Sequence, residues 1–331
     1  LNVMPSGSIL IFGPGTFKCK QTIKIPDHPT SSSRVKTLVI QGSTNVSTDS
    51  GADVVLKYTG PNPSVPTPFI DFRGSTLNKR YGGAIRNISF SGPGKDSNIV
   101  GLWMYHIWGN LFDNVGISNF KYGMQIDGHY YCCQFVHLCI FYCDYGIRTL
   151  SMSNGTTLTY CRFNGCNVGF GHSLNWYWCT GIYFNYCYFE GNKLAIQSSL
   201  GHILHINQCY FEANTKGIAE IYNSNNNVKK GLLLILENSY ISVNNLSDDL
   251  ISKSLIRQSL PTSTMTFIAN NNSFNYVPDD IDYLVYVAEG EINIKAENNI
   301  IPGQYGISTF PICSKTPLKT SYFNNDFSDT D

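Results

Sequence analysis

Charge is scarce in this sequence, and neither sign of charge prevails. Of 331 residues, 23 are Lys or Arg and 23 are Asp or Glu, so charged residues make up 14% and the formal net charge is zero. Such a balance provides no basic footprint for the phosphates of a nucleic acid. No apolar run approaches the roughly 18 residues that a membrane-spanning helix needs. We therefore expect neither nucleic-acid binding nor insertion into a membrane.

Helical periodicity and metal-binding motifs are also missing. Without long segments of helical periodicity, a Rossmann or barrel enzyme is disfavoured. The eleven cysteines form no paired C-x-x-C motifs, which argues against a zinc site. We expect neither a cofactor nor a bound metal. No signal peptide is visible and the first residue is Leu1, so we expect a fragment or a processed product.

A short alternating segment recurs through most of the chain. Each segment ends in a phenylalanine or isoleucine, at intervals of 22 to 33 residues: Phe90, Ile117, Ile140, Phe163, Phe189, Phe211, Ile241, Phe274 and Ile301. The residues two positions earlier are Ile88, Val115, Leu138, Cys161, Cys187, Cys209, Ser239, Asn272 and Asn299. Because side chains two apart on a strand point the same way, both sets are expected to face one core. Strand-based repeats of this size predict an all-β solenoid, a right-handed parallel β-helix of roughly nine to eleven coils.

Further residues recur in the same frame. Six residues after the second inward position stand Gly123, Gly146, Gly169 and Gly217, with Ala195 replacing the glycine once. The cysteines of the inward set are interpreted as small apolar core residues. Cys143 and Cys166 share another frame position on adjacent coils, where a strand spacing of about 4.8 Å would allow a disulfide. In a reducing cytoplasm they would stay free thiols. Asn272 and Asn299 are expected in stacked asparagine ladders.

Changes of composition divide the chain into three parts. Residues 1–80 contain strand-like runs separated by Pro and Gly turns, and we interpret them as the opening coils of the β-helix. Residues 81–310 carry the repeats of the main β-helix. Residues 311–331 lose the pattern and end in polar and acidic residues. We expect them to form a C-terminal tail or the start of a further domain.

A distinctive stretch lies near the N-terminus. Residues 6–17 read Ser-Gly-Ser-Ile-Leu-Ile-Phe-Gly-Pro-Gly-Thr-Phe, and residues 22–26 read Thr-Ile-Lys-Ile-Pro. The stretch resembles the opening of the pectate-lyase-like β-helix family of phage tailspikes and polysaccharide-degrading enzymes. Those proteins often begin G-x-[IV]-x-x-P-x-G-x-[YF], followed by [ST]-[IL]-x-[IL]-P. Here Gly13 stands at the first proline position, with Pro14 next. The resemblance covers most of residues 5–305 and implies a parallel β-helix.

Two glutamates fall on one outward sheet face. Glu190 and Glu212 occupy equivalent positions on adjacent coils, so their backbones are expected about 4.8 Å apart. Carboxylates this close repel, and one should hold its proton more tightly. A glycosidase needs such a pair, one acid and one base or nucleophile. A carboxyl separation of about 5–5.5 Å suits retention and a longer one inversion, and both stay open. Alternatively, the pair is solvated surface, or is bridged by Arg162 or Lys193.

The same face carries the side chains that we expect to bind a sugar: His137, Tyr160, Arg162, Tyr186, Tyr188 and Tyr210. We place all of them at outward strand positions. Tyrosine rings offer sugars a flat apolar face with a polar edge. Arg162 suits either a salt bridge to an anionic sugar or a cation–π contact with Tyr188. Tyr188 and Tyr210 suit stacking either on a sugar or on each other.

Other acids and aromatic clusters compete with this face. The acids are Asp113, Asp127 (followed by His129), Asp144 and Glu220, which stand where turn or cap roles are more common than catalysis. The aromatic clusters are Trp103, Tyr105 and Trp108, and Trp176, Tyr177 and Trp178. These clusters suit a saccharide groove or an interface between chains. We favour the interface, because His106, Tyr130 and Tyr131 are expected to thicken the same side.

Three functions fit these features. The resemblance and the Glu–Tyr–Arg face favour a phage tailspike-like depolymerase that hydrolyses a bacterial surface polysaccharide, capsule or O-antigen. The resemblance also implies a homotrimer in the virion tail, assembled in the host cytoplasm and acting at the bacterial cell surface. A lyase on the same fold is an alternative, but related pectate lyases use clustered aspartates with calcium, and the repeat face has no dense Asp cluster. The third function is a non-catalytic glycan-binding spike, since the fold does not decide among them.

Overall fold

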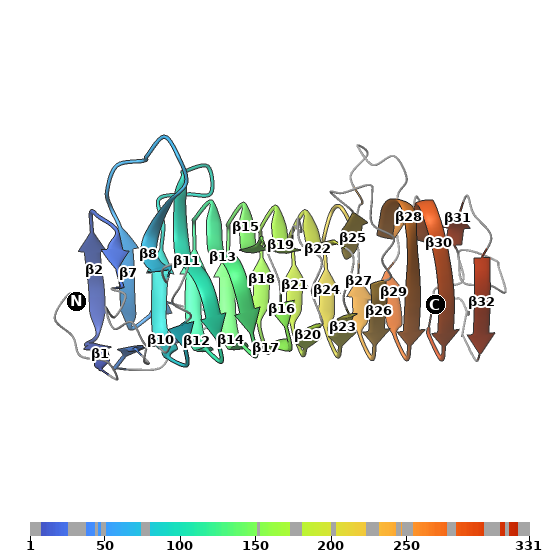
Figure 1. Ribbon diagram of the computed structural model, residues 1–331, viewed down its shortest axis with the longest axis horizontal. Coiled ribbons are helices and arrows are strands. Elements are labelled where there is room, and N and C mark those ends of the chain that lie inside the picture. The colour runs from blue at the N-terminus through green and yellow to red at the C-terminus, as the bar shows by residue number, and fades with distance from the viewer. Residues whose placement is uncertain are drawn as a thin grey trace.

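The computed structural model describes residues 8–25, 38–43, 46–47, 51–73, 80–150, 153–172, 181–199, 203–222, 232–242, 246, 254–276, 283–300, 312–314 and 318–323. In these ranges every regular element is a β-strand, and no helix could cross a membrane. The strands stack along the long axis, from β1 (Ile9–Phe12) to β32 (Leu318–Phe323) (Figure 1). The strands of this stack pair in parallel, whereas β5 (Val46–Ser47) and β6 (Gly51–Ala52) form a separate antiparallel pair.

The coils build three parallel walls, which we name sheets A, B and C. Sheet A consists of β2 (Gly15–Cys19), β7 (Val54–Tyr58), β10 (Ala84–Ser91), β12 (Leu111–Ser118), β14 (Gln134–Phe141), β18 (Arg162–Asn164), β21 (Tyr188–Glu190), β24 (Tyr210–Glu212), β27 (Tyr240–Ser242) and β29 (Ser273–Tyr276). Strands β10, β12 and β14 are bent, and only their second halves belong to sheet A. In the described part of the chain, sheet A therefore has ten rungs.

Sheets B and C complete the tube. Sheet B contains β1, β4 (Val39–Gly42), the first halves of β10, β12 and β14, then β17 (Thr156–Thr159), β20 (Ile182–Asn185), β23 (Ile203–Asn207), β26 (Leu232–Glu237), the second halves of β28 (Ser254–Asn270) and β30 (Tyr283–Glu297), and β32. Sheet C contains β3 (Ile23–Lys24), β8 (Thr67–Arg73), β11 (Ile99–Trp108), β13 (Tyr122–Tyr131), β15 (Tyr145–Thr149), β19 (Val168–His172), β22 (Leu194–Ser199), β25 (Ala219–Tyr222), the first halves of β28 and β30, and β31 (Ile312–Ser314). Two short strands, β9 (Arg80–Tyr81) and β16 (Ser153–Asn154), extend sheet C beside the ends of β11 and β13. The predicted all-β, right-handed parallel β-helix is confirmed.

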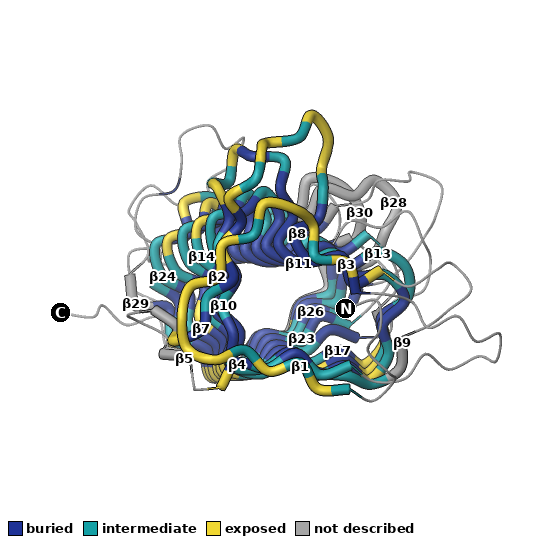
Figure 2. The backbone as a smooth tube through the Cα atoms, turned by 90° about the vertical axis from the view of Figure 1, so that its left-hand side faces the viewer, coloured by how far each residue is buried: buried dark blue, intermediate teal, exposed yellow. Residues whose placement is uncertain are grey.

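The coils superpose into a tube with a buried inner surface (Figure 2). The predicted inward positions line it, and the phenylalanines Phe163, Phe189 and Phe211 pair in register. Their rings stack at 4.9 Å and 5.1 Å between centroids, with interplanar angles of 9° and 5°. All three are fully buried, and burial of such a side chain stabilises the fold by about 1.5–3 kcal/mol. Ile301, the last member of the predicted series, lies outside the described residues.

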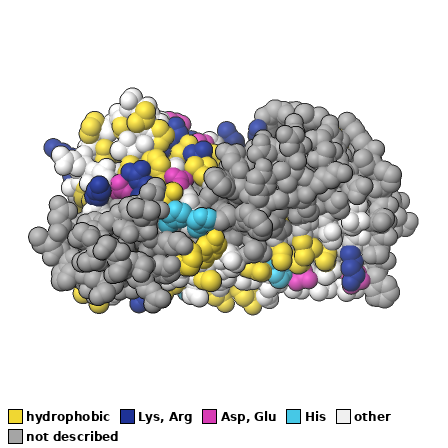
Figure 3. Space-filling model, in the orientation of Figure 1, with side chains coloured by type: hydrophobic (Ala, Val, Ile, Leu, Met, Phe, Trp, Pro, Cys, Tyr) yellow, Lys and Arg dark blue, Asp and Glu magenta, His cyan; other side chains and the backbone are white. Residues whose placement is uncertain are grey.

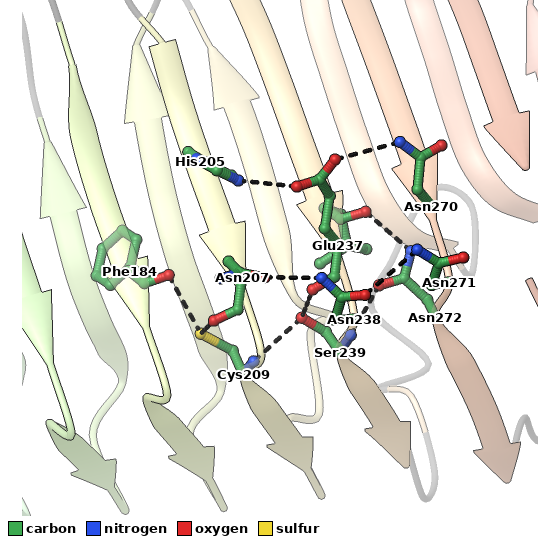
Figure 4. A network of polar contacts seen from close by, with 11 residues as sticks. Phe184, His205, Asn207, Cys209, Glu237, Asn238, Ser239, Asn270, Asn271 and Asn272 are labelled. Atoms are coloured by element: carbon green, nitrogen blue, oxygen red, sulfur yellow. Dashed lines mark hydrogen bonds and ion pairs between the residues drawn. The ribbon is translucent and has the colours of Figure 1, made fainter.

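The other inward column turns from apolar to polar along the molecule, and every member is buried. Its polar end satisfies backbone groups of neighbouring coils. The Cys209 amide donates to Ser239 Oγ (3.1 Å), and the Ser239 amide donates to Asn272 Oδ1 (3.0 Å) (Figure 4). The Asn272 amide donates in turn to Asn299 Oδ1 (3.1 Å). Asn272 Nδ2 also donates to Asn299 Oδ1 at 2.9 Å. The predicted asparagine ladder is confirmed, and it gives these backbone amides side-chain acceptors within the core.

Glycines recur in sheet C because adjacent coils approach closely there. A Cβ on Gly146 would lie 3.0 Å from the Phe163 ring, and one on Gly169 would lie 3.2 Å from the Phe189 ring. The expectation for Gly217 is wrong by one position. Ile196 pairs with Ala219, so Ile218 and not Gly217 stands beside Ala195. The turn at residues 215–216 adds a residue before β25, and Gly217 adopts a φ of +97° there.

The cysteines of the core are small apolar residues, as expected. Cys161, Cys187 and Cys209 are buried. Cys143 and Cys166 are also buried, and both are free thiols. The Cys166 amide donates to Asn192 Oδ1 at 3.0 Å, so this column also becomes polar one coil further along. Burial raises the pKa values of the Cys187 and Cys209 thiols well above their ordinary value.

The tube extends beyond the main repeats at both ends. Strands β1, β2 and β3 lie within residues 1–80 and pair with later coils. Strands β31 and β32 follow residue 310 and pair in parallel with β30. The division of the chain at residues 80 and 310 stays a prediction.

Candidate functional site on sheet A

The outward face of sheet A places the two predicted glutamates side by side. Strands β21 and β24 pair Tyr188 with Tyr210 and Glu190 with Glu212. One rung earlier, Arg162 pairs with Tyr188. The outward columns of this sheet are therefore in register, because the inward phenylalanines fix the alternation of each strand.

Each glutamate has its own hydrogen-bond partner. Arg162 Nη2 donates to Glu190 Oε2 at 2.7 Å, with about a third of each side chain exposed. Tyr210 donates its hydroxyl proton to Glu212 Oε2 at 3.0 Å. The two carboxylates thus differ in environment: a guanidinium orients and neutralises one, and a phenol orients the other. Of the alternatives drawn from the sequence, the bridge by Arg162 is the one observed at Glu190.

The phenol of Tyr210 holds its proton tightly. Burial raises its pKa to about 12, and the hydrogen bond and charge of Glu212 act in the same direction. At neutral pH the hydroxyl is therefore a donor to Glu212. The Tyr210 ring also stacks on Tyr240 at 5.0 Å and 2°, and is tilted against Tyr188 at 5.8 Å and 42°. Tyr240 was missed in the sequence, although it stands one residue before the inward Ile241, in the same frame as Tyr210.

The guanidinium of Arg162 lies over a ring other than the one expected. It is 5.9 Å from the ring centroid of Phe141, on the preceding coil. The side chain reaches Glu190 on the following coil. Arg162 therefore links three rungs of sheet A.

Three of the predicted sugar-binding residues do not lie on the strands of sheet A. His137, Tyr160 and Tyr186 adopt φ values of 50°, 53° and 54°, at the corner between sheets B and A. The expectation of outward strand positions is wrong for them, because a left-handed residue turns the chain and interrupts the alternation. The same corner holds Asn87, Asn114, Gln208, Asn238, Asn271 and Asn298 on the other coils. Asparagine, which tolerates this backbone, was the available sequence signal.

The three corner residues form a continuous, exposed aromatic column, which we name the corner strip. The His137 and Tyr160 rings stack at 5.4 Å and 11°, and the Tyr160 and Tyr186 rings at 5.0 Å and 22°. Tyr160 is 49% exposed and Tyr186 39%. On sheet A, two residues after Tyr186, Tyr188 is 50% exposed. The strip and Tyr188 present flat rings to solvent beside the glutamates.

The competing acids lie away from the outward face of sheet A. Asp113 belongs to sheet B and lies 3.7 Å from His137 Nδ1. Asp144, in a turn, accepts a hydrogen bond from Asn167 at 2.7 Å. Glu220, on sheet C, accepts a bond from Gln197 at 3.2 Å and lies 4.0 Å from Arg257. Asp127 is also on sheet C, where it accepts hydrogen bonds from Trp103 and Gln125.

The expected aromatic interface is only partly described. Trp108 and Tyr131 contact each other edge-to-face at 4.7 Å. Tyr130 is not part of that surface: it is 1% exposed and pairs with the buried Ile107. Neighbours on a strand face opposite sides, so Tyr130 and Tyr131 cannot both thicken one face. The cluster at residues 176–178 lies outside the described residues. Within the described ranges, no group of three His, Cys, Asp or Glu side chains is placed to hold a metal ion.

Comparison with known proteins supports the fold. No protein-family model and no curated protein matches this sequence. The ORF18 protein of Geobacillus virus E2 is 16% identical, with a TM-score of 0.51 over 96% of this chain and 54% of its own. Tailspike protein 3 of bacteriophage CBA120 is 12% identical, with a TM-score of 0.50 over 89% of this chain and 44% of its own.

These similarities define the class of architecture. The chain has the parallel β-helix fold, as its opening motif predicts. It spans about half the length of the two viral structures that it matches. The catalytic unit of an α-1,3-glucanase from Streptomyces thermodiastaticus is also similar, at 10% identity and a TM-score of 0.45 over 98% of this chain and 65% of its own. At such identities the likeness concerns the fold alone.

Proposed function

We propose that the outward face of sheet A binds and hydrolyses a bacterial surface polysaccharide, capsule or O-antigen, in the manner of a phage tailspike depolymerase. The observation that carries this proposal is the corner strip beside the two in-register glutamates. Two structural neighbours support it: one is a protein of Geobacillus virus E2, and the other is a tailspike protein of bacteriophage CBA120.

The corner strip is built where aromatic residues are unfavourable. A side chain with a Cβ loses about 1–2 kcal/mol in the left-handed region, and asparagine loses less. Five of the nine corner residues are asparagines, whereas His137, Tyr160 and Tyr186 follow one another on consecutive coils. Backbone strain of this kind concentrates at functional sites. Exposed, stacked rings with polar edges suit successive sugar units of an extended polymer.

Glu190 and Glu212 take the two catalytic roles in this proposal. One protonates the leaving glycosidic oxygen, and the other acts as base or nucleophile. Their backbones stand about one strand spacing apart, and the splay of the side chains decides between retention and inversion. Arg162 and Tyr210 position the two carboxylates. The same Arg162 is partly exposed and suits an acidic sugar unit.

The assembly state and location extend the proposal. We infer a homotrimer in the virion tail, assembled in the host cytoplasm and acting at the bacterial cell surface. Outward apolar side chains on sheet B support association with other chains, since Leu233, Ile235 and Ile268 are only half-buried. A sedimentation mass three times 36.9 kDa supports the trimer, and the mass of a single chain contradicts it.

The hydrolysis experiment uses the double variant E190Q/E212Q. Purified capsular polysaccharides and O-antigens are incubated with the protein, and new reducing ends are measured. We expect cleavage to fall by about 10²–10⁴-fold while glycan binding persists, because the amides keep the shape but cannot transfer protons. The matched control is E297Q, a change at a partly exposed glutamate on sheet B. An unchanged product profile in the double variant rejects the pair.

A non-catalytic glycan-binding spike is the second candidate. The Arg162–Glu190 ion pair favours it, because a carboxylate held by a guanidinium is less available as base or nucleophile. Wild-type protein that binds a polysaccharide without releasing reducing ends supports this candidate. Products that absorb ultraviolet light through a new carbon–carbon double bond would instead indicate a lyase.

A further inference from the structure

A second group of polar and aromatic side chains lies on sheet C, which is a different wall of the tube. We name it the Trp103 cluster: Asp71, Arg73, Trp103, Gln125 and Asp127. Strands β8, β11 and β13 place Asp71, Trp103 and Gln125 in one outward column, and Arg73 and Asp127 two residues further along. Viewed along the tube, β11 and β24 lie on separate walls (Figure 2). The cluster is therefore separate from the sheet A glutamates.

The first acid of the cluster is already neutralised. Arg73 Nε and Nη2 donate to the two oxygens of Asp71 at 2.8 Å and 2.7 Å. Burial of Asp71 opposes its ionisation, but the hydrogen bonds and charge of Arg73, with Lys24 nearby, outweigh it and lower the pKa of Asp71. The guanidinium also lies 4.5 Å from the ring centroid of Trp103. Arg73 is thus committed to Asp71 and Trp103.

The second acid, Asp127, accepts hydrogen bonds from uncharged donors. Trp103 Nε1 donates to Asp127 Oδ2 at 2.6 Å, and Gln125 Nε2 donates to Oδ1 and Oδ2 at 3.2 Å and 3.0 Å. The five side chains of the cluster carry a net charge of −1, and Lys24 and Arg148 stand beside Asp71 and Gln125 on the neighbouring strands. Gln125 is only 3% exposed, and its Oε1 has no hydrogen-bond partner. A buried acceptor without a donor is rare in a folded protein and needs a physical explanation.

A bulge shapes the edge of the cluster. The register between β11 and β13 shifts after Tyr105, so that β13 carries an extra residue there. His129 emerges from this bulge and stacks on His106 at 4.9 Å and 16°. Its Nδ1 is 3.1 Å from the Tyr131 hydroxyl. In the half of the molecule that holds these strands, histidines lie beside acidic and basic side chains (Figure 3). Bulges commonly redirect side chains next to binding sites.

We propose that the Trp103 cluster is a second carbohydrate-binding site, which takes a neutral sugar unit. Hydroxyl groups of the sugar donate to Asp127, and one of them gives Gln125 Oε1 its missing donor. Trp103 and Tyr105 supply the apolar surface beside these acceptors. The negative charge on Asp127 disfavours a uronate or other acidic sugar. This site is additional to the proposed cleavage site on sheet A. It would bind the same polymer at a second point and so increase the overall avidity.

The test measures glycan binding to the E190Q/E212Q variant, in which cleavage is expected to be strongly reduced. An array of bacterial capsular and O-antigen oligosaccharides identifies the neutral and the uronate-containing glycans that bind. The best neutral oligosaccharide is then titrated calorimetrically against that protein, with and without D127N. We expect D127N to weaken sheet C binding by about tenfold or more, because a charged hydrogen-bond acceptor is lost. The measured stoichiometry should fall from two sites per chain to one.

Two further variants control for structure. D127N retains an oxygen for Trp103 and offers an N–H to Gln125, so the fold is preserved. W103F keeps an aromatic ring but removes the indole donor, and should weaken binding less. D96N, at an exposed turn, is the matched control and should bind as the parent does. Equal affinity and stoichiometry in D127N, W103F and D96N overturn the proposal, as does a parent protein that binds no neutral glycan.

Failure of this proposal is distinguishable from failure of the sheet A proposal. D96N in the otherwise unchanged chain should release reducing ends at the parent rate, because Asp96 belongs to neither site. If E190Q/E212Q still cleaves, the sheet A proposal fails, but the comparison of D127N with D96N still decides the fate of the Trp103 cluster.

Discussion

Left-handed backbone at the corners of the coils admits asparagine and glycine readily, and other residues at a cost of about 1–2 kcal/mol. Two corners of this protein hold residues in this conformation. Between sheets B and A, the corner strip places aromatic rings on strained backbone. At the following corner, Asn119 and Tyr142 have φ values of 62° and 53°, Gly165 and Gly191 have 65° and 61°, and Ala213 has 53°. The Ala213 side chain is only a methyl group, so a substitution can relieve the backbone strain at this position without removing a ring.

Replacing Ala213 with glycine should therefore stabilise the protein. Relief of the left-handed strain outweighs the added backbone entropy of glycine, for a net gain of about 0.5–1 kcal/mol. Urea unfolding followed by circular dichroism measures it. Ala219→Gly is the control: Ala219 is buried in β25, and the same change should destabilise the protein there. A213G that unfolds at lower urea than the parent contradicts the assignment of strain.

The second residue-scale prediction concerns alkaline pH. Burial and the Glu212 bond raise the pKa of Tyr210 from 10.0 to about 12, so the folded state holds this proton more tightly than the unfolded chain. That contribution is complete below pH about 10 and is lost as the pH rises through about 12. The free energy of unfolding should therefore fall more steeply across this range in the parent than in Tyr210→Phe. Equal slopes in the two proteins would refute the hydrogen bond to Glu212.

At the scale of the strand, neighbouring residues have different environments. Phe189 is stacked in the core between Phe163 and Phe211, whereas Tyr188 is half-exposed on the outward face. The alternation of a three-residue strand thus separates a core position from the proposed binding face. Each strand is too short to hold its register alone, and the stacked rings of the adjacent coils fix it.

Alanine substitutions at these adjacent positions should separate the two properties. Phe189→Ala leaves a cavity in the ring stack and should cost about 3–5 kcal/mol. Tyr188→Ala should cost under about 1 kcal/mol, as surface changes do, but should weaken binding to polysaccharide. Chemical denaturation and a glycan pull-down measure the two effects. The opposite ranking of stabilities would mean that the face assignment of β21 is inverted.

Alternation made the inward columns predictable from the sequence. Phe163, Phe189 and Phe211 repeat with strong apolar character two residues after small core residues, and no other face could bury them. The register of Glu190 with Glu212 followed directly. The corner residues were misplaced because one left-handed residue breaks a pattern of period two. Gly217 was misplaced because a turn contains one extra residue.

Side-chain partners were less accessible to prediction than strand register. The sequence offered Arg162 both Tyr188 and the glutamate pair, whereas in the structure its guanidinium bonds Glu190 and lies 5.9 Å from the Phe141 ring. The Trp103 cluster is assembled from β8, β11 and β13, and its Asp71 and Arg73 come from a segment without a clear repeat. Such clusters become visible only once the coils are in place.

At the scale of the whole molecule, the β-helix is an elongated stack of coils whose sheets carry different outward side chains. Strand β24, which carries Glu212, and strand β11, which carries Trp103, lie on different walls of the tube (Figure 2). Neighbouring coils stabilise one another, so the positions of these surfaces relative to each other are set by the register of the strands. A long polysaccharide could then be held at more than one point on a single chain.

The most direct test of the central claim is a crystal structure of E190Q/E212Q with an oligosaccharide from a polysaccharide that the parent cleaves. We predict sugar rings stacked on Tyr160 and Tyr186, and a glycosidic oxygen within hydrogen-bond reach of the side chain at position 190 or 212. An oligosaccharide bound only to other walls of the tube, beyond the reach of both positions, would contradict the assignment of sheet A as the catalytic face.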